Sequence, residues 1–285
     1  MDWLAAVAHL RQDGGYGVLV TVSAVRGHAP RAPGAKMVVA ADHTWGTIGG
    51  GNVEEVAIER ARELISAGAT QVEQLTSRLN SHVRGRHGQQ CCGGEMELLL
   101  EPLPPRPSVA IFGVGHVGFE LARVLSRFEI HLHLVDSRAE QMEELRLLSL
   151  TDGPADVRAH RVLLGEDVLE QLPAGAHVVI MTHDHAEDFA LCDAAVRRPD
   201  LGSVGLIGSA AKWARFRSML TEQGHTGAAI DRITCPIGDR GITSKEPAAI
   251  AVGVAADLVR AFERSPTTQV TARRAQVAGM KTTSE

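Results

Sequence analysis

The stretch Ser108-Val-Ala-Ile-Phe112-Gly113-Val-Gly115-His-Val-Gly118 decides the fold of the larger part of this chain. A short apolar strand runs directly into a G-x-G-x-x-G pattern, a helical pattern follows, and Asp136 ends the next apolar run. In this context the glycines allow a tight turn, the approach of a pyrophosphate to backbone N–H groups, and close packing of helix on strand. We therefore expect a dinucleotide-type unit, with Asp136 accepting a hydrogen bond from a ribose hydroxyl.

The pattern of strand and helix continues beyond this motif. Apolar runs at 108–112, 130–135, 176–182 and 203–207 alternate with helical patterns at 116–128, 138–148, 186–197 and 209–222. Such alternation predicts an α/β fold with a Rossmann-like parallel sheet. The glycines could instead serve only the turn and the helix packing, in a domain that carries no nucleotide, because fold does not fix ligand.

A smaller α+β domain is expected before this sheet. The N-terminal part contains a short helical pattern, strand-like runs at 17–25, 36–40 and 95–101, and a glycine loop that opens a second helix. A proline-rich segment then breaks regular structure. We predict an N-terminal domain over 1–101, a linker over 102–107, a Rossmann-like domain over 108–264 and a flexible tail over 265–285.

Composition limits the classes of function. The chain has 285 residues, 44% hydrophobic and 22% charged, with a net charge of -5, which argues against a general nucleic-acid or membrane-surface binder. Its first residues do not resemble a secretory signal, and its most apolar late stretch, 248–256, is too short to cross a membrane. We expect a cytoplasmic protein with reduced thiols.

The N-terminal glycine loop is a candidate binding site. Gly49, Gly50, Gly51 and Asn52 precede a helix, so their backbone donors could hold an anionic or heterocyclic ligand. The loop lacks the G-K-[ST] of a phosphate loop. The alternative is a plain turn with Asn52 as the helix N-cap.

A basic segment with two adjacent thiols is a second candidate. No acidic residue occurs between Gln74 and Gly94, whereas Arg84, Arg86 and further basic residues precede Cys91 and Cys92. Neighbouring arginines increase the thiolate fraction of a cysteine, and thiolate binds soft metals or exchanges sulfur. The alternative is a solvated basic loop around one small buried cysteine.

Two motifs follow later strands of the predicted parallel sheet. Thr182-His183-Asp184-His185 favours a turn with helix capping by Asp184 over a metal site, because no third ligand is near in the sequence. Gly208, Ser209 and Lys212 indicate a phosphate contact or merely a tight strand-to-helix turn. Cys192 and Cys235 lack a basic setting and are expected to be structural.

Ordered blocks along the chain resemble the xanthine dehydrogenase accessory proteins of the XdhC/CoxI type. They are GHAPRAPGAKMVV, GTIGGGNVEEVAIERA, QCCGGEMELLLEP, VAIFGVGHVGFELARVL, MTHDHAEDFALC, GLIGSAAKWARF and CPIGDRGITSKEPAAIAVGVAADL. The resemblance implies a chaperone of purine catabolism, not a catalyst, that binds molybdenum cofactor while a cysteine desulfurase sulfurates it. It then passes the cofactor to apo xanthine dehydrogenase.

The resemblance also implies site residues. The family's glycine and Cys-Gly-Gly blocks fall on Gly49 to Gly51 and on Cys92, which we take as the candidate molybdenum ligand, with Cys91 beside it. A homodimer is the commonest symmetric assembly for such a protein. Two alternatives remain: an NAD(P)-dependent oxidoreductase, and a partner protein whose Rossmann-like half only mediates docking.

Overall fold

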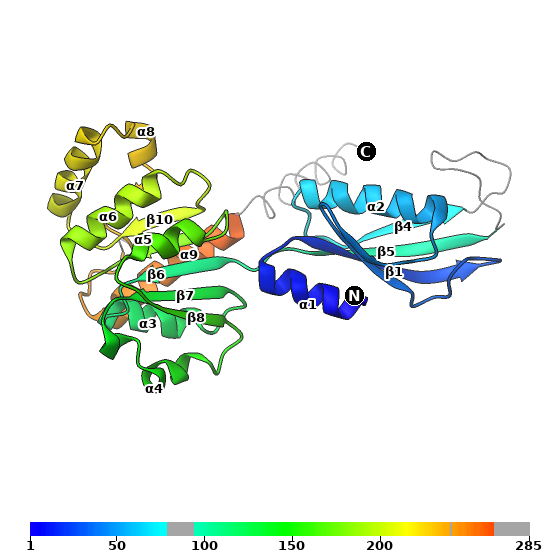
Figure 1. Cartoon of the computed structure of the whole chain (residues 1–285), viewed down its shortest axis with the longest axis horizontal. Coiled ribbons are helices and arrows are strands. Elements are labelled where there is room, and N and C mark those ends of the chain that lie inside the picture. The colour runs from blue at the N-terminus through cyan, green and yellow to red at the C-terminus, as the bar shows by residue number, and fades with distance from the viewer. Residues whose placement is uncertain (79–93, 240, 265–285) are drawn as a thin grey trace, which may run out of the picture. The chain divides into compact units, whose positions relative to one another are not determined.

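The computed structural model describes residues 1–78, 94–239 and 241–264, which form two compact units over 1–105 and 106–263. Each unit has its own sheet and its own helices (Figure 1). The predicted fold class is confirmed: a Rossmann-like parallel sheet follows a smaller α+β domain. The predicted tail at 265–285 lies outside the described residues.

The N-terminal unit is a five-stranded antiparallel sheet with one helix on each face. The strand order is β3-β2-β1-β5-β4. The elements are α1 (Trp3–Asp13), β1 (Gly17–Arg26), β2 (Lys36–Ala40), β3 (Thr44–Gly46), α2 (Gly51–Ser66), β4 (Glu73–Arg78) and β5 (Glu95–Leu103).

Alternation along β1 divides the core of this unit into two layers. Val18, Val20 and Val22 are buried in the cluster that includes the apolar face of α2. Leu19, on the opposite face, packs with the cluster that α1 forms through Leu10. Side chains of a strand point alternately to its two faces, so one valine-rich strand serves both layers.

Strand β5 extends through Pro102, beyond the end that the apolar pattern indicates. Pro102 lies opposite Val18 of β1, whereas the pairing with β4 on the other side stops at Leu100. A proline, which has no N–H to donate, is tolerated where a strand has a neighbour on one side only.

The C-terminal unit is a six-stranded parallel sheet in the order β11-β10-β9-β6-β7-β8. Its order reverses between β6 and β9, the switch point at which ligands bind in such sheets. Its strands are β6 (Ser108–Phe112), β7 (His131–Asp136), β8 (Asp156–Arg161), β9 (His177–Ile180), β10 (Ser203–Leu206) and β11 (Ile233–Thr234).

Helices cover both faces of this sheet (Figure 1). One core layer includes residues of α3 (His116–Leu125), α4 (Glu144–Leu147) and α9 (Pro247–Arg264). The other includes residues of α5 (Gly165–Gln171), α6 (His185–Val196) and α7 (Ala210–Glu222), while α8 (Gly227–Ile230) adds Ile230. No helix among the described residues is both long and apolar enough to span a membrane.

One predicted helix is wrong. The pattern at 138–148 predicts a single helix, but the chain forms a 3-10 turn at Ala139–Gln141, then α4, then a second 3-10 turn at Leu148–Leu150. Glu143, which precedes α4, is extended with φ -63° and ψ 131°. A helix cannot continue through a residue in that conformation.

Candidate functional site

The loop between β6 and α3 is closely packed around its glycines. Gly113 has φ +98°, and a Cβ there would overlap the carbonyl oxygen of Met181 at the end of β9. A Cβ on Gly118 would overlap the carbonyl oxygen of Gly113. These two glycines therefore allow the turn and the close approach of α3 to the sheet.

Asp136, at the end of β7, is bound on both of its carboxylate oxygens. Oδ2 accepts hydrogen bonds from the Val114 N–H at 2.8 Å and from Nη2 of Arg138 at 2.8 Å. Oδ1 accepts from the Arg138 N–H at 3.0 Å and from its Nε at 2.9 Å. Asp136 is 3% exposed, and these four bonds use the acceptor positions that a carboxylate offers.

This arrangement bears on the expected ribose contact. Burial opposes ionisation of Asp136, but the hydrogen bonds from Arg138 and Val114 outweigh it and lower the pKa of this carboxyl. A ribose hydroxyl would have to displace Arg138 from Asp136. The Arg138 side chain also lies against the glycine loop, because its Nη2 is 3.8 Å from the position that a Cβ on Gly115 would take. Asp136 thus acts as a clamp that connects the loop after β6, through Val114, with the loop after β7, through Arg138.

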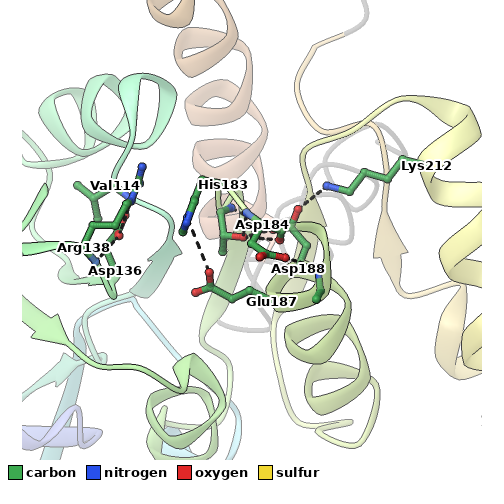
Figure 2. A network of polar contacts seen from close by, with 10 residues as sticks. Val114, Asp136, Arg138, His183, Asp184, Glu187, Asp188 and Lys212 are labelled. Carbon is green, nitrogen blue, oxygen red and sulfur yellow. Dashed lines mark hydrogen bonds and ion pairs between the residues drawn. The ribbon is translucent and has the colours of Figure 1, made fainter.

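The end of β9 supplies a second group of polar residues (Figure 2). Asp184 is the N-cap of α6 and accepts from the Ala186 N–H at 2.6 Å, which confirms its predicted capping role. Nδ1 of the half-exposed His183 lies 4.0 Å from Oε2 of Glu187. Burial raises the pKa of the Glu187 carboxyl, and nearby aspartates raise it further against the opposing effect of His183. Glu187 can therefore hold a proton more readily than an ordinary glutamate.

Lys212, on α7, joins Asp188 on α6 to the loop that follows β10 (Figure 2). Its ammonium group bonds the carboxylate of Asp188 and donates to the Ile207 carbonyl at 3.0 Å. Asp188 is 1% exposed and also accepts from the Thr182 N–H at 3.0 Å and its hydroxyl at 2.8 Å. The motif of Gly208, Ser209 and Lys212 is predicted to be either a phosphate contact or a tight strand-to-helix turn. Because the Lys212 ammonium group is already bonded within the protein, the structure favours the turn.

The N-terminal glycine loop folds around one carboxylate of its own chain. Oε2 of Glu54 accepts from the Ile48 N–H at 2.9 Å, from the Gly50 N–H at 3.0 Å and from the Thr47 hydroxyl. Helix α2 begins at Gly51 with Gly50 as its N-cap, so the alternative of Asn52 as N-cap is wrong. A negative side chain is stabilised at a helix N-terminus, and here the side chain is Glu54.

A turn at residues 28–31 contacts the glycine loop and the start of β5. A Cβ on Gly49 would overlap Pro30 and lie 3.3 Å from Cγ of Arg31, and one on Gly94 would overlap the His28 carbonyl oxygen. In contrast, a Cβ on Gly50 or Gly51 would meet nothing within 4 Å. Space is therefore open on the Cβ side of Gly50 and Gly51, although the Gly50 N–H is already bonded to Glu54.

The basic thiol segment cannot be placed in this geometry. Arg84, Arg86, Cys91 and Cys92 lie outside the described residues. Of the remaining cysteines, Cys192 is fully buried and burial raises the pKa of its thiol; burial also raises the pKa of the half-buried Cys235. Both environments suit structural thiols. Within 1–78, 94–239 and 241–264, no group of three or more His, Cys, Asp or Glu could hold a metal ion.

Sequence reasoning did not single out Arg138 or Glu54. Arg138 follows Asp136 by two residues, a spacing that permits a local ion pair but does not require one. Glu54 lies in the first turn after glycines that expose N–H groups, and this combination is a usable signal for an internal carboxylate cap.

The strand order, the glycine loop and the acidic residue ending β7 define a Rossmann-type protein with an additional N-terminal α+β domain. A family model described as XdhC Rossmann domain matches residues 109–258, and one described as XdhC and CoxI family matches residues 10–76. The chain belongs to the XdhC family.

The chain is similar to known proteins in sequence and in structure. The chain is 26% identical over 246 residues to the uncharacterized protein YqeB of Escherichia coli strain K12, covering 85% of this chain but 42% of that protein. A crystal structure described as a xanthine dehydrogenase from Bacillus halodurans is 18% identical, covers 94% of this chain and 99% of that one, and has a TM-score of 0.47. The chain thus spans less than half of the length of YqeB.

Proposed function

We propose that this protein is an accessory factor for xanthine dehydrogenase that binds molybdenum cofactor, holds it during sulfuration and delivers it to the apoenzyme. The observation that carries the proposal is the family match, which covers parts of both units, 10–76 and 109–258. Its partners would be xanthine dehydrogenase and a cysteine desulfurase that supplies the sulfur. The protein itself would not catalyse turnover.

The N-terminal unit offers groups that suit an anionic ligand. Space is open on the Cβ side of Gly50 and Gly51, and the exposed Arg31 lies next to Gly49. Glu54 already accepts from two N–H groups of this loop, so a phosphate would bind through the remaining donors and Arg31. When bound, the cofactor would supply a molybdenum centre with a dithiolene and an anionic phosphate.

Thiols complete the proposed site. Cys91 and Cys92 precede Gly94, which packs against the same turn, 28–31, that contacts Gly49. We assign the soft thiolate ligand of molybdenum to Cys92, with Cys91 beside it, and electrostatic attraction of the cofactor to Arg84 and Arg86.

Cofactor content tests the proposal. The full chain is purified after co-expression with the cofactor pathway, and molybdenum and released pterin are measured per protein. We expect both to be retained by the parent and to fall several-fold when Cys91 and Cys92 are both replaced by serine, because serine is not a thiolate at neutral pH. The matched control is Cys235→Ser, in the other unit, which should retain the parent's content.

Two results would contradict the proposal, the first its function and the second its assignment of the thiol ligands. One is a parent protein that carries neither molybdenum nor pterin under conditions in which a known molybdoenzyme is loaded. The other is a doubly substituted protein that delivers sulfurated cofactor to apo xanthine dehydrogenase as well as the parent does. In the second case the thiols would not be the ligands.

The alternative function is an NAD(P)-dependent oxidoreductase. The G-x-G-x-x-G loop that follows β6 and Asp136 favour an oxidoreductase. However, both carboxylate oxygens of Asp136 are already bonded to Arg138 and Val114. Steady-state assays with NAD(P)+ or NAD(P)H on alcohols, aldehydes and purines test it. Sustained turnover proportional to this protein would establish the alternative and contradict a chaperone-only role.

A further inference from the structure

The parallel sheet of the C-terminal unit has two edges of different length. One edge is β11, which pairs with β10 over only two residues. The other is β8, which pairs with β7 over all six of its residues without a shift in register (Figure 1). Within the described part of the chain, β8 has no strand on its outer side. A long, regular edge strand exposes a row of backbone N–H and C=O groups, so β8 is the edge that can accept a further strand.

The two faces of β8 carry different side chains. Val157 packs against the core layer of α3 and α9, and Ala159, two residues further along this face, is exposed. On the opposite face Nη2 of Arg158 lies 2.7 Å from Oδ2 of Asp156, and these side chains are 43% and 41% exposed. Charges of one sign protect an edge strand against pairing, but this edge carries an acid and a base two residues apart. Such an edge can match a copy of itself.

This charge pattern favours one register for pairing β8 with β8 of a second copy. Two identical edges that meet around a two-fold axis run antiparallel, and residues opposite each other lie on the same face. Pairing centred on Val157 places Asp156 of each copy opposite Arg158 of the other, so that four charges alternate around the axis. Pairing centred on Arg158 would oppose two arginines, and pairing centred on Ala159 would leave Asp156 without a cation across the seam. Opposite charges across neighbouring strands stabilise the pair, and like charges destabilise it.

Exposed leucines flank the same edge. Leu163 and Leu164, just after β8, are 86% and 60% exposed, and Leu148, in the 3-10 turn before it, is 50% exposed. In the pairing centred on Val157, the end of each β8 lies beside the segment that precedes β8 in the other copy. Leu163 and Leu164 of one copy therefore approach the part of the second copy that carries Leu148. Burial of apolar side chains at both ends would add to the association.

We propose that β8 is an interaction surface for a second copy of this chain, and that antiparallel β8–β8 pairing centred on Val157 joins two parallel sheets into one. Backbone hydrogen bonds across the seam would supply affinity, and the alternating charges of Asp156 and Arg158 would fix the register. The inference is independent of the proposed function, because it rests only on the edge of the C-terminal sheet.

Cysteine trapping tests the pairing and its register. Val157→Cys and Ala159→Cys are each made in a full chain that carries Cys91→Ser and Cys92→Ser, and the proteins are oxidised mildly before non-reducing electrophoresis. Opposite residues on antiparallel strands have Cα atoms about 4.5–5.5 Å apart, within the range of about 4.4–6.8 Å that a disulfide spans. We therefore expect Val157→Cys to form a linked dimer in high yield. Ala159→Cys is the matched control, because in this register its two copies would lie about 13 Å apart along the strands.

Charge reversal tests the alternating charges. Sedimentation velocity over a range of concentrations measures the dissociation constant of the dimer. Arg158→Glu places two acidic side chains opposite each other on both sides of the axis, so the dissociation constant should rise at least about tenfold. Exchanging the charges, with Asp156→Lys and Arg158→Glu together, should restore most of the affinity. The matched control is Arg215→Glu, at an exposed arginine on α7, and circular dichroism confirms that each variant is folded.

The outcomes decide for or against this surface. Linking of Val157→Cys alone, with a weaker dimer for Arg158→Glu than for Arg215→Glu, would support it. It would be overturned by a parent chain that is monomeric at every concentration, by equal linking of the two cysteine variants, or by equal dissociation constants for Arg158→Glu and Arg215→Glu. If the charge exchange prevents folding, the cysteine variants still decide, because neither alters a charge. A monomeric protein that retains cofactor would overturn this surface alone and leave the proposed function in place.

Discussion

The backbone N–H of Val114 donates to Oδ2 of Asp136 across 2.8 Å, so the end of β7 holds the glycine loop that follows β6. The carbonyl of the same Val114 accepts from Arg146 at 3.0 Å. One peptide segment thus connects Asp136, at the switch point, with Arg146 on α4. A change at either side is expected to alter the other, because both depend on the position of this loop.

Asp136→Asn should destabilise the C-terminal unit. The change removes the charge opposite Arg138 and places an amide NH₂ where a carboxylate oxygen accepts two hydrogen bonds. Removing one partner of a buried pair costs about 3 kcal/mol, so the free energy of unfolding should fall by roughly that amount. Urea unfolding followed by circular dichroism measures the change. The control is the exposed Asp152→Asn, and an equal effect of the two substitutions would show that the clamp contributes no stability.

Gly118→Ala should destabilise the chain more than an ordinary helical substitution. The new Cβ would overlap the Gly113 carbonyl oxygen, and that backbone is itself fixed against Met181, so neither side can move easily. Overpacking of this kind costs about 1–3 kcal/mol. Gly227→Ala is the matched control, because a Cβ there meets nothing within 4 Å. Thermal unfolding that gives the same midpoint for both variants would contradict the packing role of Gly118.

The sequence predicts the strands that are buried and misses those at the sheet edges. Apolar runs such as Ser108–Phe112 are buried along their whole length, so their signal is strong. Strand β8, Asp156–Arg161, is polar and half exposed at the edge of its sheet, and β4, Glu73–Arg78, is polar and also an edge strand. Edge strands need apolar side chains on at most one face, and the pattern then resembles a loop.

The candidate site is less predictable than the fold. The glycine spacing indicates where the β6–α3 loop turns, but it does not reveal that Arg138 covers Asp136. That contact depends on the direction of the side chain after β7, which only the folded turn fixes. Likewise, the proximity of Gly49 and Gly94 to one turn, 28–31, joins segments far apart in the sequence. No local pattern contains that information.

Two histidines on neighbouring strands should make stability depend on pH. Nδ1 of His133 on β7 lies 3.0 Å from Nε2 of His160 on β8, and the rings stack at 5.2 Å. Burial, followed by the charge of His160, lowers the pKa of His133 to about 4. The other charged groups around it are Arg158, His131 and Asp156, and Asp156 opposes the shift.

The sign of the pH effect follows from this lowered pKa. Because the unfolded chain binds a proton on His133 near pH 6.5 and the folded chain only near pH 4, stability is present above about pH 6.5 and is lost as the pH falls between these values. The loss attributable to His133 reaches about 3 kcal/mol at the lower limit. Urea unfolding at pH 7, 6 and 5 should therefore show declining stability, and His133→Leu should flatten the decline. His28→Gln, at an exposed histidine of the other unit, serves as the control and should leave the slope unchanged. A parent protein equally stable at pH 7 and pH 5 would show that His133 does not titrate between its folded and unfolded states.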